Sequence, residues 1–129
     1  PEVYSMVRGE AFALRACCHF DLLRTYGPVP SKVEAGKKYL PYVRVNDAGN
    51  YEYHTFDQFM EYVQADLDSA EFLLEKYDPV LTTNISYTES SYSTWSYRKS
   101  RMNYYGVLGL QARVALWIHK SRGLNYNSN

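Results

Sequence analysis

The sequence predicts an all-α fold of three long helices, with a long extended loop between the first two. Apolar residues recur at steps of three and four in three separate segments, which is the spacing of one face of a helix. In addition, 46% of the residues are hydrophobic and the formal net charge is zero, so the chain can form a packed core. At 129 residues, we expect one helical domain over residues 1–129.

The first predicted helix covers residues 3–26. Its apolar positions at helical spacing are Val7, Ala11, Leu14, Cys18 and Leu22, and they are interpreted as its packing face. Gly27-Pro28 predicts the end of this helix, because glycine can adopt the left-handed cap conformation and proline cannot continue a helix. The adjacent Cys17 and Cys18 have no third cysteine to pair with, so both are interpreted as small buried hydrophobic side chains.

The connection between the first two helices, residues 28–54, is long for a compact domain. Residues 39–45 have the composition of an extended segment, and residues 46–49 predict a turn that leads back toward residues 51–53. We therefore expect either a short two-stranded element or a well-packed loop in this connection.

The second predicted helix covers residues 55–77. Its apolar series is Phe56, Phe59, Met60, Val63, Leu67, Ala70 and Leu74. Thr55 followed by Gln58 matches a capping box, and Asp78-Pro79 predicts the helix end.

The other face of this second helix carries a row of carboxylates. They are Glu61, Asp66, Asp68, Glu71 and Glu75. A catalytic acid/base pair needs two carboxyl groups that face each other across a cleft, with burial raising the pKa of one of them. Neighbours on one exposed helix face have neither property, so we interpret this row as a solvated face.

The third predicted helix covers residues 101–120. It carries a row of small residues: Gly106, Gly109, Ala112 and Ala115. Each glycine inside a helix costs about 1 kcal/mol relative to alanine. Such a cost is tolerable where the missing side chains allow another helix to approach closely, so we interpret this row as a structural helix-packing face.

Arg113 and Asp21 are charged residues within apolar stretches of two different helices. A partly buried guanidinium needs a partner, so Arg113 could pair with Asp21 across the interface between these helices. Alternatively, Arg113 reaches solvent and Asp21 pairs with Arg24 one turn further along its own helix. The sequence leaves both interpretations open.

No pattern in the chain predicts catalysis, a cofactor or a metal site. There is no glycine-rich phosphate loop, no G-x-S-x-G and no H-E-x-x-H, and His19, His54 and His119 are scattered without ligand spacing. The zero net charge gives no electrostatic reason to expect nucleic acid as a partner. We therefore predict a binding or scaffold protein and not an enzyme.

The connection at residues 80–99 is rich in aromatic side chains, among them Tyr92, Trp95 and Tyr97. Aromatic faces stack well on the C–H faces of sugar rings and on bases, although loop aromatics more often cover a core. These three residues are the candidate ligand-binding residues of the sequence.

Three strings together carry a resemblance to a known family. They are RACCHFDLLRTYGPVP at residues 15–30, TFDQFM and DLDSA at 55–60 and 66–70, and RMNYYGVLGLQARVALW at 101–117. Over residues 3–120 the chain resembles the SusD/RagB family of nutrient-binding outer-membrane lipoproteins from Bacteroidetes.

The resemblance implies a tetratricopeptide-like α-α superhelix, and the string Tyr105-x-x-Leu108-Gly109-x-x-Ala112 fits the first helix of such a repeat. It also implies a glycan ligand, or a peptide in some members, that is bound without bond cleavage. The implied partner is a TonB-dependent, SusC-like transporter, and the implied location is the cell surface of the outer membrane. The lipid anchor of the family lies outside this chain.

Members of this family are several times longer, so the resemblance implies a fragment. The residues after Trp117 are polar and do not predict the second helix of the pair. We therefore expect the small-residue face of the third helix to remain uncovered, which favours self-association of the fragment. The alternative function is a tetratricopeptide-type protein-interaction scaffold without direct ligand binding.

Overall fold

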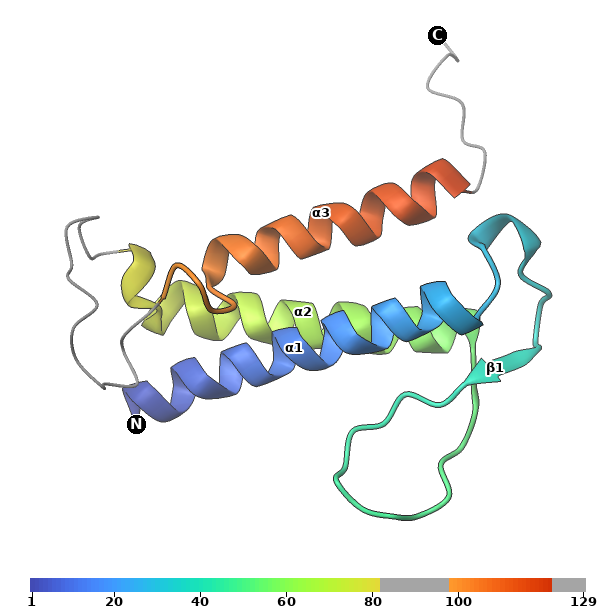
Figure 1. Cartoon of the computed structure of the whole chain (residues 1–129), viewed down its shortest axis with the longest axis horizontal. Coiled ribbons are helices and arrows are strands. Elements are labelled where there is room, and N and C mark those ends of the chain that lie inside the picture. Colours follow the sequence, from blue (N-terminus) through green and yellow to red (C-terminus); the bar gives the residue numbers. More distant parts are fainter. Residues whose placement is uncertain (82–97, 122–129) are drawn as a thin grey trace, which may run out of the picture.

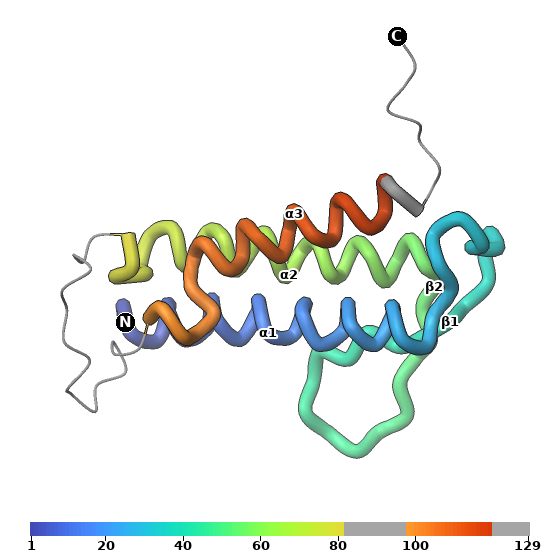
Figure 2. Tube along the Cα trace, turned by 45° about the horizontal axis from the view of Figure 1, so that its top comes forward, coloured from blue at the N-terminus to red at the C-terminus, as the bar shows by residue number. Residues whose placement is uncertain are grey.

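The computed structural model describes residues 1–81 and 98–121 and confirms the all-α class. Its three long helices are α1 (Glu2–Tyr26), α2 (Phe56–Tyr77) and α3 (Tyr104–Ser121). Neighbouring helices run in opposite directions, with α1 beside α2 and α3 laid along this pair (Figure 1). In both views α3 and residues 41–53 lie on opposite sides of the pair, whereas the turn at Pro30–Lys32 lies against α3 (Figure 2).

The helix ends are set largely by local hydrogen bonds. Thr55 and Gln58 form the predicted capping box at the start of α2, with reciprocal bonds of 3.0 and 3.2 Å. The third helix begins later than the predicted residue 101, because the Asn103 side chain accepts the Gly106 amide proton at 2.9 Å. Asn103 thereby satisfies a donor that the first helical turn leaves without an intrahelical partner.

The predicted packing face of α1 is wrong. Val7, Leu14 and Leu22 are 40%, 50% and 46% exposed, and Ala11 and Cys18 are exposed as well. The buried side chains lie on the opposite face of the helix: Met6, Ala13, Ala16, Phe20 and Leu23. The helix carries apolar residues at helical spacing on both faces, so the periodicity alone did not identify the face that packs against α2.

The face of α1 that does pack approaches α2 closely at Gly9. A Cβ atom at this position would lie 3.0 Å from Leu74 Cγ and 3.1 Å from Leu73 Cβ. Small residues at a crossing let two helix backbones approach, which improves the packing of the larger side chains around them.

Aromatic side chains fill the other end of the core, where α3 covers the α1–α2 pair. Trp117 of α3 packs edge-on against Phe20, with ring centroids 5.3 Å apart, and lies 6.1 Å from the ring of Phe56. Val107, Leu110 and Val114 provide the rest of the buried face of α3. All three helices therefore contribute to one hydrophobic core.

The long connection forms the short two-stranded element that was one of the two expectations. After the 3-10 turn η1 (Pro30–Lys32), β1 (Lys38–Leu40) pairs antiparallel with β2 (His54–Thr55). The predicted strand segments 39–45 and 51–53 are thus displaced toward the two ends of the connection. Residues 41–53 form a loop, and its inner side chain, Tyr42, is only 4% exposed.

Gly27 ends α1 in a different way from the one predicted. Its φ of −91° and ψ of 178° are extended, not left-handed, and its amide donates to the Leu23 carbonyl at 2.8 Å. A Cβ at this position would lie 2.7 Å from both Leu23 O and Leu23 Cδ1. The glycine is therefore needed for space and not for its access to positive φ.

Substituting two helical glycines with alanine should change stability in opposite directions. Gly109→Ala should raise the free energy of unfolding by about 0.5–1 kcal/mol, because alanine is the better helix former. No atom lies within 4 Å of a Cβ at Gly109. Gly9→Ala should lower the free energy of unfolding by about 1 kcal/mol or more, although it brings the same gain in helix propensity. The reason is that Leu74 is fully buried and cannot move away from the added methyl group. Urea unfolding followed by circular dichroism measures both, and equal shifts in the two variants would contradict the close approach at Gly9.

Candidate functional site

The three aromatic residues predicted to bind ligand, Tyr92, Trp95 and Tyr97, lie outside the described residues. The described residues on either side of this segment are held together by charged side chains in the protein interior. These charged groups, and a groove on the surface between α1 and α2, are the features of the described chain that bear on a binding function.

A buried ion pair joins the end of α2 to the residue that follows the aromatic segment. Arg98 Nε lies 2.9 Å from Asp78 Oδ1, and Arg98 Nη2 lies 2.7 Å from Asp78 Oδ2. The side chain of Asp78 is completely buried and that of Arg98 is 6% exposed. Such a two-point contact fixes both the distance and the orientation of the two groups.

Glu10 of α1 brings a second carboxylate to the same guanidinium. Arg98 Nη1 donates to Glu10 Oε1, and Arg101 Nη2 donates to Glu10 Oε2. Two carboxylates thus face two guanidiniums in this Arg98 cluster (Glu10, Asp78, Arg98 and Arg101). Burial lowers the pKa of Arg98, but hydrogen bonds to Asp78 and Glu10 outweigh it and leave the pKa raised, so this group stays charged.

Asp78 also positions the start of α3. Its Oδ2 atom accepts the amide proton of Tyr104, the first residue of α3, at 2.9 Å, and its Oδ1 atom accepts that of Val80 at 3.0 Å. A carboxylate at a helix N-terminus is favoured by the helix dipole as well as by this hydrogen bond. The Arg98 cluster therefore ties together α1, the end of α2 and the beginning of α3.

A second buried group is centred on Asp66, which was wrongly assigned to the solvated face of α2. Asp66 is 5% exposed and accepts hydrogen bonds from Arg15 Nε at 2.7 Å and Arg15 Nη2 at 2.6 Å. The Tyr42 hydroxyl donates to Asp66 Oδ2 at 2.5 Å. Hydrogen bonding to Asp66 raises the pKa of Arg15, whereas burial, followed by the bond to Asp66, raises the pKa of Tyr42. The loop is thus fastened to both helices through one carboxylate.

Sequence reasoning missed these buried charges, although a weak signal for two of them was present. Glu10 falls in register with Met6 and Ala13 on the buried face of α1, and Asp66 falls in register with Val63 and Ala70 on α2. Carboxylates at apolar positions of a helical repeat indicate buried, paired charges. No comparable spacing marks Asp78 or Arg98, which lie outside the helices.

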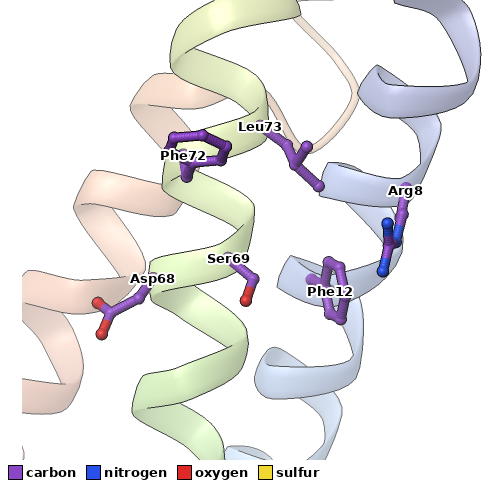
Figure 3. A pocket seen from close by; sticks show the side chains of 6 residues that line it. All are labelled: Arg8, Phe12, Asp68, Ser69, Phe72 and Leu73. Carbon is purple, nitrogen blue, oxygen red and sulfur yellow. The ribbon is translucent and has the colours of Figure 1, made fainter. Parts of the chain in front are cut away.

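The surface groove lies between α1 and α2 and has a volume of about 420 Å³. Its lining residues are Arg8, Phe12, Asp68, Ser69, Phe72 and Leu73. Phe12 and Leu73 reach toward the space between the helices from opposite sides, and Arg8 lies beside Phe12 (Figure 3). The Arg8 guanidinium carbon is 5.4 Å from the centre of the Phe12 ring, and Phe72 is 68% exposed. The groove offers aromatic and charged groups together.

The structural residues predicted from the sequence lie at the surface. Asp21 Oδ1 is 3.8 Å from Arg24 Nη1, and both Asp21 and Arg113 are exposed, which matches the second of the two interpretations given above. Gly106 and Gly109 are exposed together with Ala112 and Ala115, so the small-residue face of α3 is uncovered in the described part of the chain. It therefore has the shape of a helix-packing face, and no part of residues 1–81 and 98–121 covers it.

Residues 1–81 and 98–121 contain neither a metal site nor a membrane-spanning helix. Within these ranges, no three or more His, Cys, Asp or Glu side chains gather where they could hold a metal ion. No helix in the same ranges combines the length and the apolar character needed to cross a membrane.

The chain matches a known protein family over most of its length. A family model for SusD-like proteins, described as starch-binding and associating with the outer membrane, matches residues 1–97. The matched part is 97 of the 129 residues and contains α1, both strands, α2 and the three residues Tyr92, Trp95 and Tyr97. No curated protein matches the chain.

Removal of the central guanidinium of the Arg98 cluster should strongly destabilise the fold. Arg98→Met leaves the fully buried Asp78 and the buried Glu10 without their main countercharge, and we expect a loss of about 3–5 kcal/mol in the free energy of unfolding. Arg24→Met is the matched control, because it removes only the exposed pair with Asp21 and a contact with the Phe20 ring, and it should cost less than about 1 kcal/mol. Similar losses in the two variants, measured by urea unfolding, would show that the cluster does not stabilise the fold.

Tyr42 should make the protein less stable at alkaline pH. In the unfolded chain a tyrosine ionises near pH 10, whereas the native fold raises the pKa of Tyr42 and keeps its proton. The native state therefore binds more protons than the unfolded state above about pH 10, and the free energy of unfolding falls as pH rises through this range.

Tyr42→Phe should lower stability at neutral pH by about 1–3 kcal/mol, because the bond to Asp66 is lost, and should flatten the alkaline decline. Tyr26→Phe, at a tyrosine that is 73% exposed, is the control and should keep the wild-type pH dependence. Urea unfolding between pH 8 and 10.5 compares the three proteins; an unchanged alkaline slope in Tyr42→Phe would refute this assignment.

Proposed function

The chain belongs to the SusD-like family, and from this we propose that it is part of a cell-surface protein that binds nutrient glycans for uptake across the outer membrane. The observation that carries the proposal is the family match over residues 1–97. The description of that family as starch-binding makes an α-glucan the first ligand to test. The proposed function is binding without bond cleavage.

We assign the sugar contact to the aromatic segment that contains Tyr92, Trp95 and Tyr97, all of which fall within the matched residues. Sugar rings present C–H faces that stack on aromatic side chains, while their hydroxyl groups need polar partners at the rim. Arg98 and Asp78 support this assignment indirectly, because they hold together the described residues that flank the segment on both sides.

The proposed partner is a TonB-dependent, SusC-like transporter in the outer membrane, which the binding protein would cover on the extracellular side. The family description, which includes association with the outer membrane, supports this partner and this location. A lid of this kind keeps the ligand at a high local concentration next to the transporter pore.

A second candidate function is a tetratricopeptide-type scaffold that binds another protein and no sugar. Two exposed faces favour it. Val7, Leu14 and Leu22 give α1 an apolar outer face, and the small residues around Gly109 do the same for α3. Helices with apolar residues on two sides are usually buried on both, so these faces suit contact with a protein surface.

Titration of the chain with a starch oligosaccharide such as maltoheptaose tests the glycan proposal. Tryptophan emission should change on binding because of Trp95, whereas Trp117 packs against Phe20 and Phe56 and serves as an internal reference. Trp95→Ala should weaken binding about five- to tenfold, since one lost stacking contact is worth roughly 1–1.5 kcal/mol. Tyr26→Ala, at an exposed tyrosine at the end of α1, is the matched control and should bind like the wild type.

The same titration, monitored by calorimetry, separates the two candidate functions. Saturable binding that Trp95→Ala weakens and Tyr26→Ala leaves unchanged supports glycan binding. No binding of any α-glucan by a folded wild-type chain would favour the scaffold. Equal affinity in the wild type and in separate alanine variants of Tyr92, Trp95 and Tyr97 would move the sugar contact away from the aromatic segment.

A further inference from the structure

Two consecutive backbone amides of the loop 41–53 donate to imidazole rings from two different elements. The Val43 amide donates to His19 Nε2 at 3.0 Å, and the Tyr42 amide donates to His54 Nδ1 at 3.0 Å. His19 belongs to α1 and His54 to β2. The two histidines therefore hold adjacent residues of the loop, one from a helix and one from a strand.

These bonds define the protonation state of each ring. An amide N–H can only donate, so His19 Nε2 and His54 Nδ1 must each present a lone pair. His19 Nδ1 lies 2.8 Å from the Arg15 carbonyl oxygen, which can only accept, so this nitrogen carries the proton. His19 is thus the neutral Nδ1–H tautomer, and His54, when neutral, carries its proton on Nε2.

A second proton on either ring removes the acceptor on which the loop depends. A doubly protonated imidazole has no lone pair, so its N–H would point at the amide N–H of Val43 or Tyr42. The amide would lose its partner and two donors would face each other, which strongly favours separation. Protonation of the rings and attachment of the loop at these two points exclude each other.

The surrounding charges offer little compensation to a protonated ring. The carboxylate of Asp66, from α2, is held by Arg15 of α1 and by the Tyr42 hydroxyl. Glu52, in the loop before β2, lies 3.4 Å from Lys38 of β1. Both acids are thus already paired.

Cationic side chains of α1, the loop and β1 also lie near His19 and His54. Arg15 precedes His19 by one turn of α1, and Lys38 lies in the strand paired with β2. The Arg44 guanidinium lies 4.5 Å from the centre of the Tyr62 ring, against which His54 packs edge-on at 5.0 Å. The charged groups around the two rings are therefore these cations and the two acids that already have partners.

We propose that His19 and His54 form a pH-sensitive latch that holds the loop 41–53 against α1 and α2 at neutral pH and releases it in mild acid. The His19 ring stacks on Tyr42 with centroids 4.1 Å apart, so release at His19 also loosens the packing of Tyr42. The latch does not depend on the identity of any ligand.

Amide hydrogen exchange of the whole chain, followed by NMR, tests the latch at its two bonds. From pH 7.5 to 5.0, and after correction for intrinsic exchange, the protection factors of the Tyr42 and Val43 amides should fall at least about tenfold. Amides in the centre of α2, such as that of Leu67, should keep their protection. Loop amides that remain equally protected while the two rings titrate would overturn the proposal.

Variants at the three histidines separate the latch from general acid effects. The double variant His19→Gln/His54→Gln cannot titrate at these positions and should lose the pH dependence of loop exchange. His119→Gln, in α3, is the matched control and should retain it. An undiminished pH dependence in the double variant would overturn the latch.

A measurement on the wild type keeps the proposal falsifiable if the double variant fails to fold. Imidazole ¹⁵N chemical shifts at pH 7.5 report the tautomer of each ring. We expect Nδ1–H for His19 and Nε2–H for His54, as the two amide bonds require. The opposite tautomer in either ring would show that the corresponding bond is not made.

Discussion

Asp78 is completely buried at the end of α2, in surroundings where a carboxylate without a countercharge would cost several kcal/mol. Its bonds to Arg98 remove that penalty, and they require residue 98 to return to the end of α2. Once Arg98 is there, its remaining nitrogen reaches Glu10 on α1, and Asp78 itself accepts the first amide of α3. The relative placement of the three helices follows from the need to neutralise this one buried group.

Features that depend on neighbouring residues were predictable from the sequence. The capping box joins Thr55 to Gln58, only three residues further along the chain. The sequence spacing of such a local interaction is enough to predict its geometry. Features set by tertiary packing were not predictable in this way. The packing face of α1 was wrong because both faces are apolar, and the face with Gly9 was chosen by its fit to Leu74 of α2.

The same distinction explains the errors at Asp66 and Gly27. Asp66 has the spacing of a buried position, but a carboxylate there is stable only because Arg15 and Tyr42, distant in sequence, converge on it. Gly27 was correctly identified as the helix end, yet its role is to avoid a clash with Leu23, which no local propensity describes. The assignment of aromatic residues as sugar contacts is based on composition and family membership.

The inner side of the loop 41–53 is held in place although no strand among the described residues pairs with it. Two of its backbone donors are satisfied by histidine rings, and its Tyr42 hydroxyl reaches Asp66. Side chains thus take the place that a neighbouring strand would occupy in a sheet. Such an arrangement links the backbone of the loop to groups that change their protonation state, which a purely backbone ladder would not do.

The long separation of Glu10 from its partners has a consequence for the order of folding. Arg98 is 88 residues further along the chain, and Arg101 is 91 residues further. Before these arginines arrive, the packed α1–α2 pair would bring two carboxylates, those of Glu10 and Asp78, into the same apolar region without any guanidinium between them. The α1–α2 pair alone is therefore destabilised by its two unpaired carboxylates. The arginines that neutralise them come from the last third of the chain, so the packing of α1 against α2 is coupled to the docking of α3. A nascent chain that stops before residue 98 should be held in an open, chaperone-accessible form.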